Sequence, residues 1–274
     1  MQIADSPLYL FVKGPMDLNS QRFVAMIGTR KNTLYGTQMT EQLVAGLKKY
    51  NVNIISGLAY GIDGIAHAKA NATRSPNCAV LAHGLDTIYP KKHYSLAQEI
   101  INTGGVLVTE HLSKTPMHPD LFPRRNRIVA GISKATIIVE SAAKGGSLVT
   151  ADIANSYDKD VFAVPGRTTD IYSKGCNNLI KNNQANLLTS AKDIVKMLNW
   201  DLNEKSKIIQ KQLFVELNEN EQKIYDLLHE KGQQLLDVIS LECNIPMYQL
   251  SAILLQMELR GITKPLPGKM FELI

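Results

Sequence analysis

The stretch 135-ATIIVESAAKGGSLVTADIA-154 has the pattern of a buried strand followed by a glycine turn and a helix. Its first part, ATIIVE (135–140), is rich in β-branched apolar residues and does not alternate with polar ones, which is typical of a parallel strand buried on both faces. Gly145 and Gly146 then introduce a helical pattern. A strand that passes into a helix through a short glycine loop is the repeating unit of an α/β domain.

The same unit recurs throughout the first 200 residues. Short apolar runs predict six further strands, FVAMIG (23–28), NIISG (53–57), CAVLA (78–82), VLVTE (106–110), VFAVPG (161–166) and NLLT (186–189). Helical patterns lie between them at 35–50, 61–72, 93–104, 124–133 and 146–157. This regular alternation predicts an α/β fold whose sheet is mostly parallel, doubly wound and of Rossmann type.

The C-terminal part of the chain has a different pattern. Three helical stretches follow one another from Asn218, a candidate N-cap, and Pro246 opens the third. The segment ITKPLPGKMFEL (262–273) then predicts two short strands joined by a Pro-Gly turn. The sequence therefore predicts a Rossmann-type domain over 1–200, a polar linker over 201–217 and a small winged-helix domain over 218–274.

Composition is that of an ordinary globular protein, since 45% of the 274 residues are hydrophobic and 20% are charged. No run of about 18 apolar residues predicts a membrane span, and the N-terminus lacks the pattern of a secretory signal. The three cysteines lie far apart, and the six histidines show no metal-binding spacing. We therefore expect a cytoplasmic protein with reduced thiols, no bound metal and no membrane association.

Positive charge is concentrated in the larger predicted domain. Residues 1–204 hold 22 Lys and Arg against 16 Asp and Glu, a balance of +6, whereas residues 205–274 hold 8 against 9. The first part is therefore the better partner for an anion. The third helix of the predicted winged helix offers only Gln249, Gln256 and Arg260 for reading a duplex. We expect 218–274 to be a protein-interaction or regulatory module.

Four loops at the carboxyl ends of predicted strands combine glycine with small polar or cationic residues. In a doubly wound sheet this edge holds the ligand, and glycine lets the backbone approach it closely. The loops contain Gly28-Thr29-Arg30, Ser56-Gly57, Lys144-Gly145-Gly146-Ser147 and Pro165-Gly166-Arg167. The amides of Gly145, Gly146 and Ser147 at a helix N-terminus, with Lys144 beside them, predict a phosphate site. A tight turn in which Ser147 caps the helix is the alternative.

The motif FPRRNR (122–127) places three arginines within six residues. These cations repel one another unless an anion lies among them, and the nearest acids in the sequence, Glu110 and Asp120, are too few to pair with all three. Arginine suits bidentate contact with phosphate, and Phe122 offers a base a stacking face. Within this motif we expect Arg125 and Arg127 to contact phosphate or to position the pocket. We expect Asn126 to make a polar contact and Arg124 to face solvent.

Several nucleotide-binding and catalytic fingerprints are missing from the sequence. No G-x-G-x-x-G follows a strand, and neither G-x-x-x-x-G-K-[ST] nor G-x-S-x-G is present. A dinucleotide cofactor and a P-loop hydrolase are therefore disfavoured, and we expect no cofactor. Asp63 lies in the first turn of the predicted helix 61–72, and we expect it to cap that helix or pair with an arginine rather than to act in catalysis.

In their order along the chain, these motifs resemble the DNA-processing protein A family (DprA, also called Smf). The resemblance covers roughly residues 8–200 and rests on VAMIGTR, ISGLAYGIDGIAH, AVLAHGLDTIYP, FPRRNRIVAGIS, KGGSLVTADIA, VFAVPG and SKGCNNLIKNNQA. The sequence departs from the family at two points. Only about twenty residues precede VAMIGTR, so we do not expect the N-terminal helical domain that many members carry. Ala82-His83 stands where the family usually has Gly and a small residue.

The resemblance implies an extended Rossmann fold that binds single-stranded DNA as a homodimer. It also implies that the protein protects incoming DNA and loads the RecA recombinase during natural transformation and recombination. Carried over position by position, the DNA site would comprise Arg30, Ser56, Gly57, Arg125, Asn126, Arg127, Lys144, Gly146 and Ser147, with Lys174 and Asn177 nearby.

An enzyme is the competing interpretation. The lysine-decarboxylase-like nucleoside-monophosphate phosphoribohydrolases also have a Gly-Gly phosphate loop followed by a helix, but they need carboxylates just after the glycines. Here that stretch is SLVTAD, in which Asp152 is the only acid. Arginines without a base, a metal or a nucleophile favour holding a phosphodiester over cleaving it. We therefore expect a DNA-binding protein with no catalytic residues.

Overall fold

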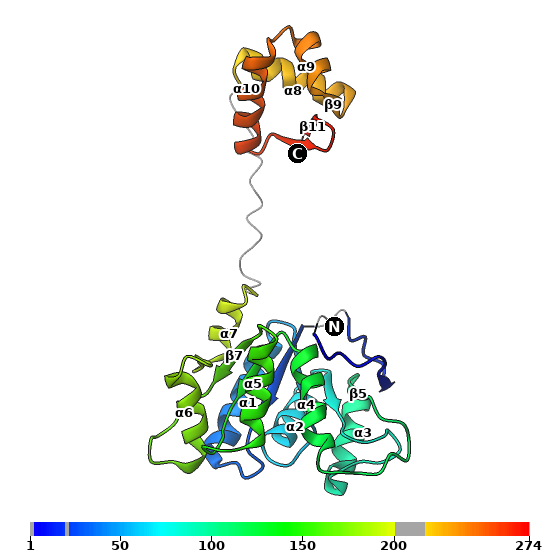
Figure 1. The fold of residues 1–274 in the computed structure, drawn as a ribbon, viewed down its shortest axis with the longest axis vertical. Coiled ribbons are helices and arrows are strands. Elements are labelled where there is room, and N and C mark those ends of the chain that lie inside the picture. Colours follow the sequence, from blue (N-terminus) through cyan, green and yellow to red (C-terminus); the bar gives the residue numbers. More distant parts are fainter. Residues whose placement is uncertain (1–2, 20–21, 201–216, 274) are drawn as a thin grey trace. The chain divides into compact units, whose positions relative to one another are not determined.

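The computed structural model describes residues 3–19, 22–200 and 217–273. The chain divides into two compact units, residues 1–203 and 204–274 (Figure 1). The linker predicted over 201–217 lies outside the described residues, except for Leu217, which packs against the core of the second unit.

One eight-stranded sheet forms the centre of the first unit. Its strands are β1 (Phe11–Lys13), β2 (Arg22–Ile27), β3 (Val52–Ser56), β4 (Asn77–Val80), β5 (Val106–Thr109), β6 (Ala135–Ile138), β7 (Asp160–Ala163) and β8 (Asn186–Leu187). They lie in the order β1-β5-β4-β3-β2-β6-β7-β8, and only the pair β1 and β5 is antiparallel. The seven predicted strands are confirmed, and β1 is an additional edge strand.

Helices cover both faces of this sheet (Figure 1). The predicted helices are α1 (Leu34–Lys48), α2 (Ile62–Ala72), α3 (Tyr94–Asn102), α4 (Leu121–Ile132) and α5 (Gly146–Ser156), and the sequence did not predict α6 (Lys174–Lys181) and α7 (Ala191–Met197). Alternate residues of β2 point to opposite cores. Val24 and Met26 pack with α1, α2 and α7, whereas Phe23, Ala25 and Ile27 pack with α4, α5 and α6. The sheet is therefore doubly wound and apolar on both faces.

The direction of winding reverses at β2, which has β3 on one side and β6 on the other. The loops after β2 and β6 therefore leave the sheet next to each other, and the Thr29 amide donates to the Glu140 carbonyl at 2.8 Å. The loop after β3 joins them at Gly61, whose φ is +77° and where a Cβ would lie 2.2 Å from the Thr29 carbonyl oxygen. Three loops thus meet where a ligand is expected.

The second unit is a winged helix, as predicted. It contains α8 (Glu219–Lys231), β9 (Gln234–Leu235), α9 (Leu236–Cys243), α10 (Met247–Leu259), β10 (Thr263–Leu266) and β11 (Met270–Leu273). The three strands pair in the order β10-β11-β9, and Asn218 caps α8 through a capping box with Glu221. Among the described residues no single helix is long and apolar enough to cross a membrane. By length and composition only, α9 and α10 pass together as a pair bent by 108°.

Candidate nucleic-acid interface

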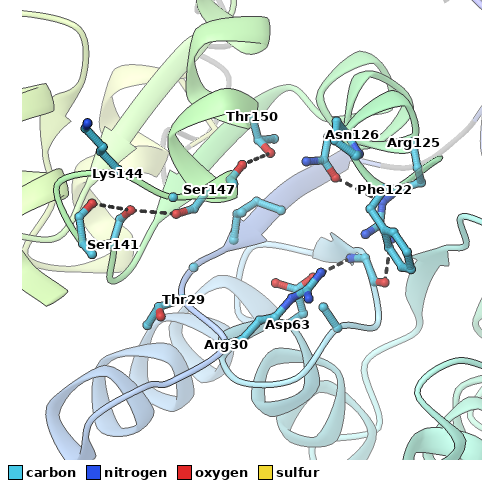
Figure 2. Close-up of a pocket in the computed structure, with 18 of the residues that line it drawn as sticks. Thr29, Arg30, Asp63, Phe122, Arg125, Asn126, Ser141, Lys144, Ser147 and Thr150 are labelled. Carbon is cyan, nitrogen blue, oxygen red and sulfur yellow. Dashed lines mark hydrogen bonds between the residues drawn. The ribbon is translucent and has the colours of Figure 1, made fainter. Parts of the chain in front are cut away.

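A pocket of about 620 Å³ opens at the carboxyl edge of the sheet, where the loops after β2, β3 and β6 meet the first turns of α4 and α5 (Figure 2). Most of the predicted site residues line this pocket: Arg30, Gly57, Phe122, Arg125, Asn126, Lys144, Gly145, Gly146 and Ser147. Three of the four predicted loops and the FPRRNR motif therefore meet at one place in the fold, whereas the fourth loop, Pro165-Gly166-Arg167, does not line the pocket.

The Gly-Gly loop presents the N-terminus of α5 to the pocket. Gly145 is the N-cap residue and no side chain caps the helix, so the first amides and the positive end of the helix dipole are available to an anion. The predicted alternative, in which Ser147 caps the helix, is wrong, because its hydroxyl donates to Ser141 Oγ at 2.8 Å. A Cβ on Gly146 would meet no atom within 4 Å, so the approach to these amides is open.

Arg30 and Lys144 are the exposed cations of the pocket. The guanidinium carbon of Arg30 lies 5.7 Å from the centre of the Phe122 ring, a cation–π contact that leaves its N–H groups for a ligand. Within the described part of the chain, neither Arg30 nor Lys144 has an acidic partner. Both are therefore placed to bind phosphate.

Arg125 has a different environment, since it is buried with only 5% exposure. Its Nη1 donates to the Gly57 carbonyl at 2.5 Å and to the Val80 carbonyl, and its Nε donates to Asn126 Oδ1 at 3.1 Å. Burial lowers the pKa of its guanidinium to about 10, against the opposing effect of Asp63. Of the two roles predicted for Arg125, these contacts favour positioning of the pocket over direct phosphate contact.

Among the described residues that line the pocket, Asp63 is the one carboxylate. Its Oδ2 accepts from the Gly57 amide at 3.1 Å. Burial raises the pKa of this carboxyl group, and the charge of Arg125 and the Gly57 hydrogen bond oppose the rise. Asp63 is thus bonded to the backbone and acted on by the charge of a nearby arginine, without a direct ion pair to it among the described residues, and this favours the predicted structural role.

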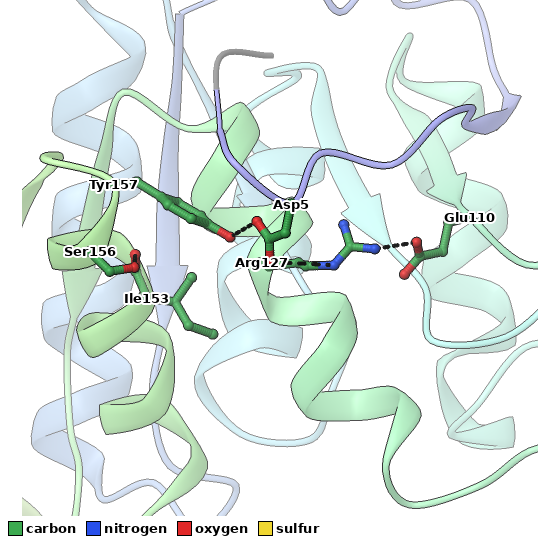
Figure 3. A network of polar contacts seen from close by, with 6 residues as sticks. All are labelled: Asp5, Glu110, Arg127, Ile153, Ser156 and Tyr157. Carbon is green, nitrogen blue, oxygen red and sulfur yellow. Dashed lines mark hydrogen bonds and ion pairs between the residues drawn. The ribbon is translucent and has the colours of Figure 1, made fainter.

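Arg127 lies outside the pocket, which corrects the expectation that it faces the same ligand as its neighbours. Its Nη2 donates to Glu110 and its Nε lies 3.9 Å from an Asp5 carboxylate oxygen (Figure 3). The Tyr157 hydroxyl donates to the other oxygen of Asp5. From the sequence, Glu110 and Asp120 were expected to be too few acids to pair with three arginines. In the structure Glu110 pairs with Arg127, and Asp5 from the N-terminal segment is a second acid beside it.

Replacing Arg127 with alanine should therefore lower stability without weakening DNA binding. The Arg127–Glu110 pair is largely buried, and its loss should lower the free energy of unfolding by about 1–3 kcal/mol because Glu110 loses its partner. Urea unfolding and a titration with oligo-dT measure the two effects. Arg124→Ala is the matched control, since Arg124 is exposed. Weaker DNA binding with unchanged stability would return Arg127 to the DNA site.

Three other predicted site residues also lie outside the pocket. Ser56 is fully buried and its hydroxyl donates to the Met26 carbonyl at 2.6 Å. The Asn177 side chain accepts from the Gly166 amide at 3.2 Å and donates to the Gly166 carbonyl at 2.9 Å. Lys174 is exposed at the start of α6. Ser56 and Asn177 thus stabilise the backbone around the site through hydrogen bonds. The predicted proximity of Lys174 to DNA stays a prediction.

Sequence reasoning missed Tyr89, which lines the pocket. Its ring centre lies 5.8 Å from that of Phe122. Tyr89 lies in the loop after the predicted strand that became β4. Its position at the carboxyl end of a strand was a signal, but that loop was not one of the four that we selected for glycine with small polar or cationic residues.

Two family models and several named relatives match this chain. The family model for DNA recombination-mediator protein A matches residues 1–199, and the model for the DprA winged helix domain matches residues 213–269. Protein Smf of Escherichia coli K12 is 34% identical over 270 residues, which are 96% of this chain and 71% of that protein. DNA processing protein DprA of Bacillus subtilis 168 is 39% identical over 197 residues, which are 72% of this chain and 66% of that protein.

Two solved structures share the fold of the first unit. DNA processing protein A from Streptococcus pneumoniae has a TM-score of 0.67 at 37% identity, over 71% of this chain and 68% of that one. DNA processing protein A from Helicobacter pylori, described for its single-stranded DNA binding mode, has a TM-score of 0.66 at 32% identity, over 73% of this chain and 90% of that one. The chain belongs to the DNA recombination-mediator protein A family, known as DprA or Smf.

Proposed function

We propose that this chain binds single-stranded DNA in the pocket at the carboxyl edge of its sheet. The charge arrangement carries the proposal: Arg30 and Lys144 are exposed beside the uncapped N-terminus of α5, whereas Asp63 is engaged with Gly57 and Arg125. Such a surface attracts phosphates, and Phe122 adds a face for a base. The single-stranded DNA binding mode described for the Helicobacter pylori relative supports the same function.

Membership in the family supports a role beyond binding. On this proposal the protein acts in the cytoplasm as a homodimer, protects incoming single strands and loads the RecA recombinase onto them during natural transformation and recombination. The assembly of RecA filaments on a strand already coated by single-strand binding protein tests this role. Added protein should accelerate filament assembly, and an unchanged rate would restrict the function to DNA binding.

The alternative of a nucleoside-monophosphate phosphoribohydrolase has weaker support. Asp63 is the one carboxylate among the described residues of the pocket lining, and it accepts a hydrogen bond from the Gly57 amide beside the charge of Arg125. Asp152 is exposed on α5 and does not line the pocket. In the part of the chain that the structure describes, the site therefore offers no pair of carboxylates for general acid–base work. Incubation with AMP followed by detection of adenine separates the two functions, and sustained release of adenine would favour the enzyme.

The winged helix is proposed to serve protein interaction or regulation. Two of the cations that could touch DNA are paired with acids, Arg260 with Glu221 and Lys264 with Glu272, each at 2.7 Å. The exposed surface of α10 carries three large apolar side chains, Tyr248, Leu255 and Leu259, beside the polar Gln249, Ser251 and Gln256. Exposed apolar side chains on this helix suit a protein partner better than base edges, which are read mainly by polar side chains.

A chain that ends at Trp200 should therefore keep most of the single-strand affinity. The first unit has its own sheet, both helical layers and the whole pocket, so it is expected to fold without the second unit. Fluorescence-anisotropy titrations of the full and the shortened chain with labelled oligo-dT measure the difference. Loss of most of the affinity on shortening would assign DNA binding to the winged helix.

A further inference from the structure

A second, smaller cavity of about 20 Å³ adjoins the DNA pocket. Arg30, Tyr89 and Phe122 line both cavities, and Tyr60 and Pro90 line only the smaller one. The phosphate-attracting groups Lys144 and the N-terminus of α5 belong only to the larger cavity. The site thus has a cationic part and an aromatic part, with Arg30 between them.

The aromatic part presents rings to solvent. Tyr89 is 43% exposed and Tyr60 is 40% exposed, although aromatic side chains stabilise a fold most when they are buried. The Tyr89 ring is tilted by 58° to the Phe122 ring, with their centres 5.8 Å apart. The smaller cavity, of about 20 Å³, is too small to enclose a nucleobase, so a base at the aromatic part of the site would lie against the faces of these exposed rings.

Histidines contact both tyrosines, Tyr89 at its backbone and Tyr60 at its ring. The buried His83 donates from Nδ1 to the Gly84 carbonyl at 2.9 Å, so its Nε2 accepts from the Tyr89 amide at 3.2 Å. His93 donates from Nδ1 to the Leu58 carbonyl at 2.9 Å, and its ring meets the Tyr60 ring edge-on with centres 5.2 Å apart. Fixed rings lose little conformational entropy when they bind a ligand.

We propose that Tyr60, Tyr89 and Phe122 form an aromatic rim on which successive bases of a single strand stack, while Arg30 and Lys144 hold its phosphates. This inference rests on the proposed function and adds two tyrosines to the site. Stacking accepts any base because every base has a π face. The bases of a duplex are already stacked inside the helix, so the rim selects single strands.

The test compares two oligonucleotides with equal numbers of phosphates, oligo-dT and an abasic strand of the same length. The full-length protein should bind oligo-dT at least roughly 5-fold more tightly, since base–aromatic stacking gives about 1–3 kcal/mol per base. Tyr89→Leu and Tyr60→Leu should each reduce the ratio of the oligo-dT affinity to the affinity for the abasic strand. Both variants should leave the abasic affinity and the salt dependence unchanged. Lys144→Ala should weaken binding to both strands alike and preserve the ratio.

Two control variants accompany these measurements. Tyr89→Phe keeps an aromatic ring and should keep the ratio, and Tyr94→Leu removes an exposed tyrosine that lines neither cavity. Equal affinity of the unaltered protein for both strands would overturn the aromatic rim and leave phosphate binding intact. A ratio that Tyr89→Leu does not change would also overturn it. Failure to bind either strand would contradict the proposed function itself.

Discussion

Replacing both Arg30 and Lys144 with alanine should weaken single-strand binding by at least roughly 100-fold, because each removes a charge-assisted hydrogen bond worth about 1.5–3 kcal/mol. These two cations are exposed, line the pocket and lack an acidic partner among the described residues. The salt dependence should also flatten. On single strands each phosphate contact contributes about 0.7 to the slope of log K against log salt, so the slope should fall by about 1.4.

Anisotropy titrations with oligo-dT at several salt concentrations measure both quantities. The matched control is Lys181→Ala with Lys192→Ala, which removes two exposed positive charges outside the pocket. This control should change affinity and slope much less, because distant charges act only through the overall potential. If the two double variants behaved alike, general attraction by the basic domain would replace the pocket as the explanation.

Replacing Arg125 with methionine should lower the free energy of unfolding by about 3–5 kcal/mol, because it leaves the buried carbonyls of Gly57 and Val80 without their donor and removes the positive charge that acts on the buried Asp63. Arg125 is buried, its pKa is affected by the charge of Asp63, and its Nη1 donates to the carbonyls of Gly57 and Val80. Gly57 and Asp63 line the pocket, and Val80 ends the strand β4. Loss of the arginine that bonds to this backbone should therefore also disorder the DNA site.

Urea unfolding followed by tryptophan fluorescence measures this effect. Trp200 is the single tryptophan of the chain and packs against the core of the first unit, so its signal reports on the domain that holds Arg125. Arg124→Met is the control within the same motif, and its effect should stay within about 0.5 kcal/mol because Arg124 is exposed. Equal stabilities of the two variants would show that Arg125 is not a structural arginine.

The sheet could be predicted because its strands are short apolar runs separated by helical patterns. β2 illustrates this: its residues contact two helical layers, so the run needs no polar alternation. The antiparallel edge strand β1 escaped prediction because it has only three residues and no fully buried side chain. The helix α6 escaped for a similar reason, since its apolar residues are few within a polar stretch.

The location of the site was predictable, but the roles of the arginines were only partly so. Carboxyl ends of parallel strands meet at one edge, which brought Gly28, Gly57 and Gly145 together. The partners of Arg125 and Arg127, by contrast, come from distant segments, among them Val80 and Asp5. One local signal was available for Arg125. It lies three and four residues before Ile128 and Val129 on α4, so it shares their buried face.

The most direct test of the central claim is a salt-dependent anisotropy titration of the unaltered protein with one DNA sequence, presented as a single strand and as a duplex. Binding in the pocket predicts tighter binding of the single strand at every salt concentration. It also predicts a log–log slope at least as steep as about −1.4, the contribution of the two contacts made by Arg30 and Lys144. Equal or tighter binding of the duplex, or single-strand binding that does not respond to salt, would contradict the claim.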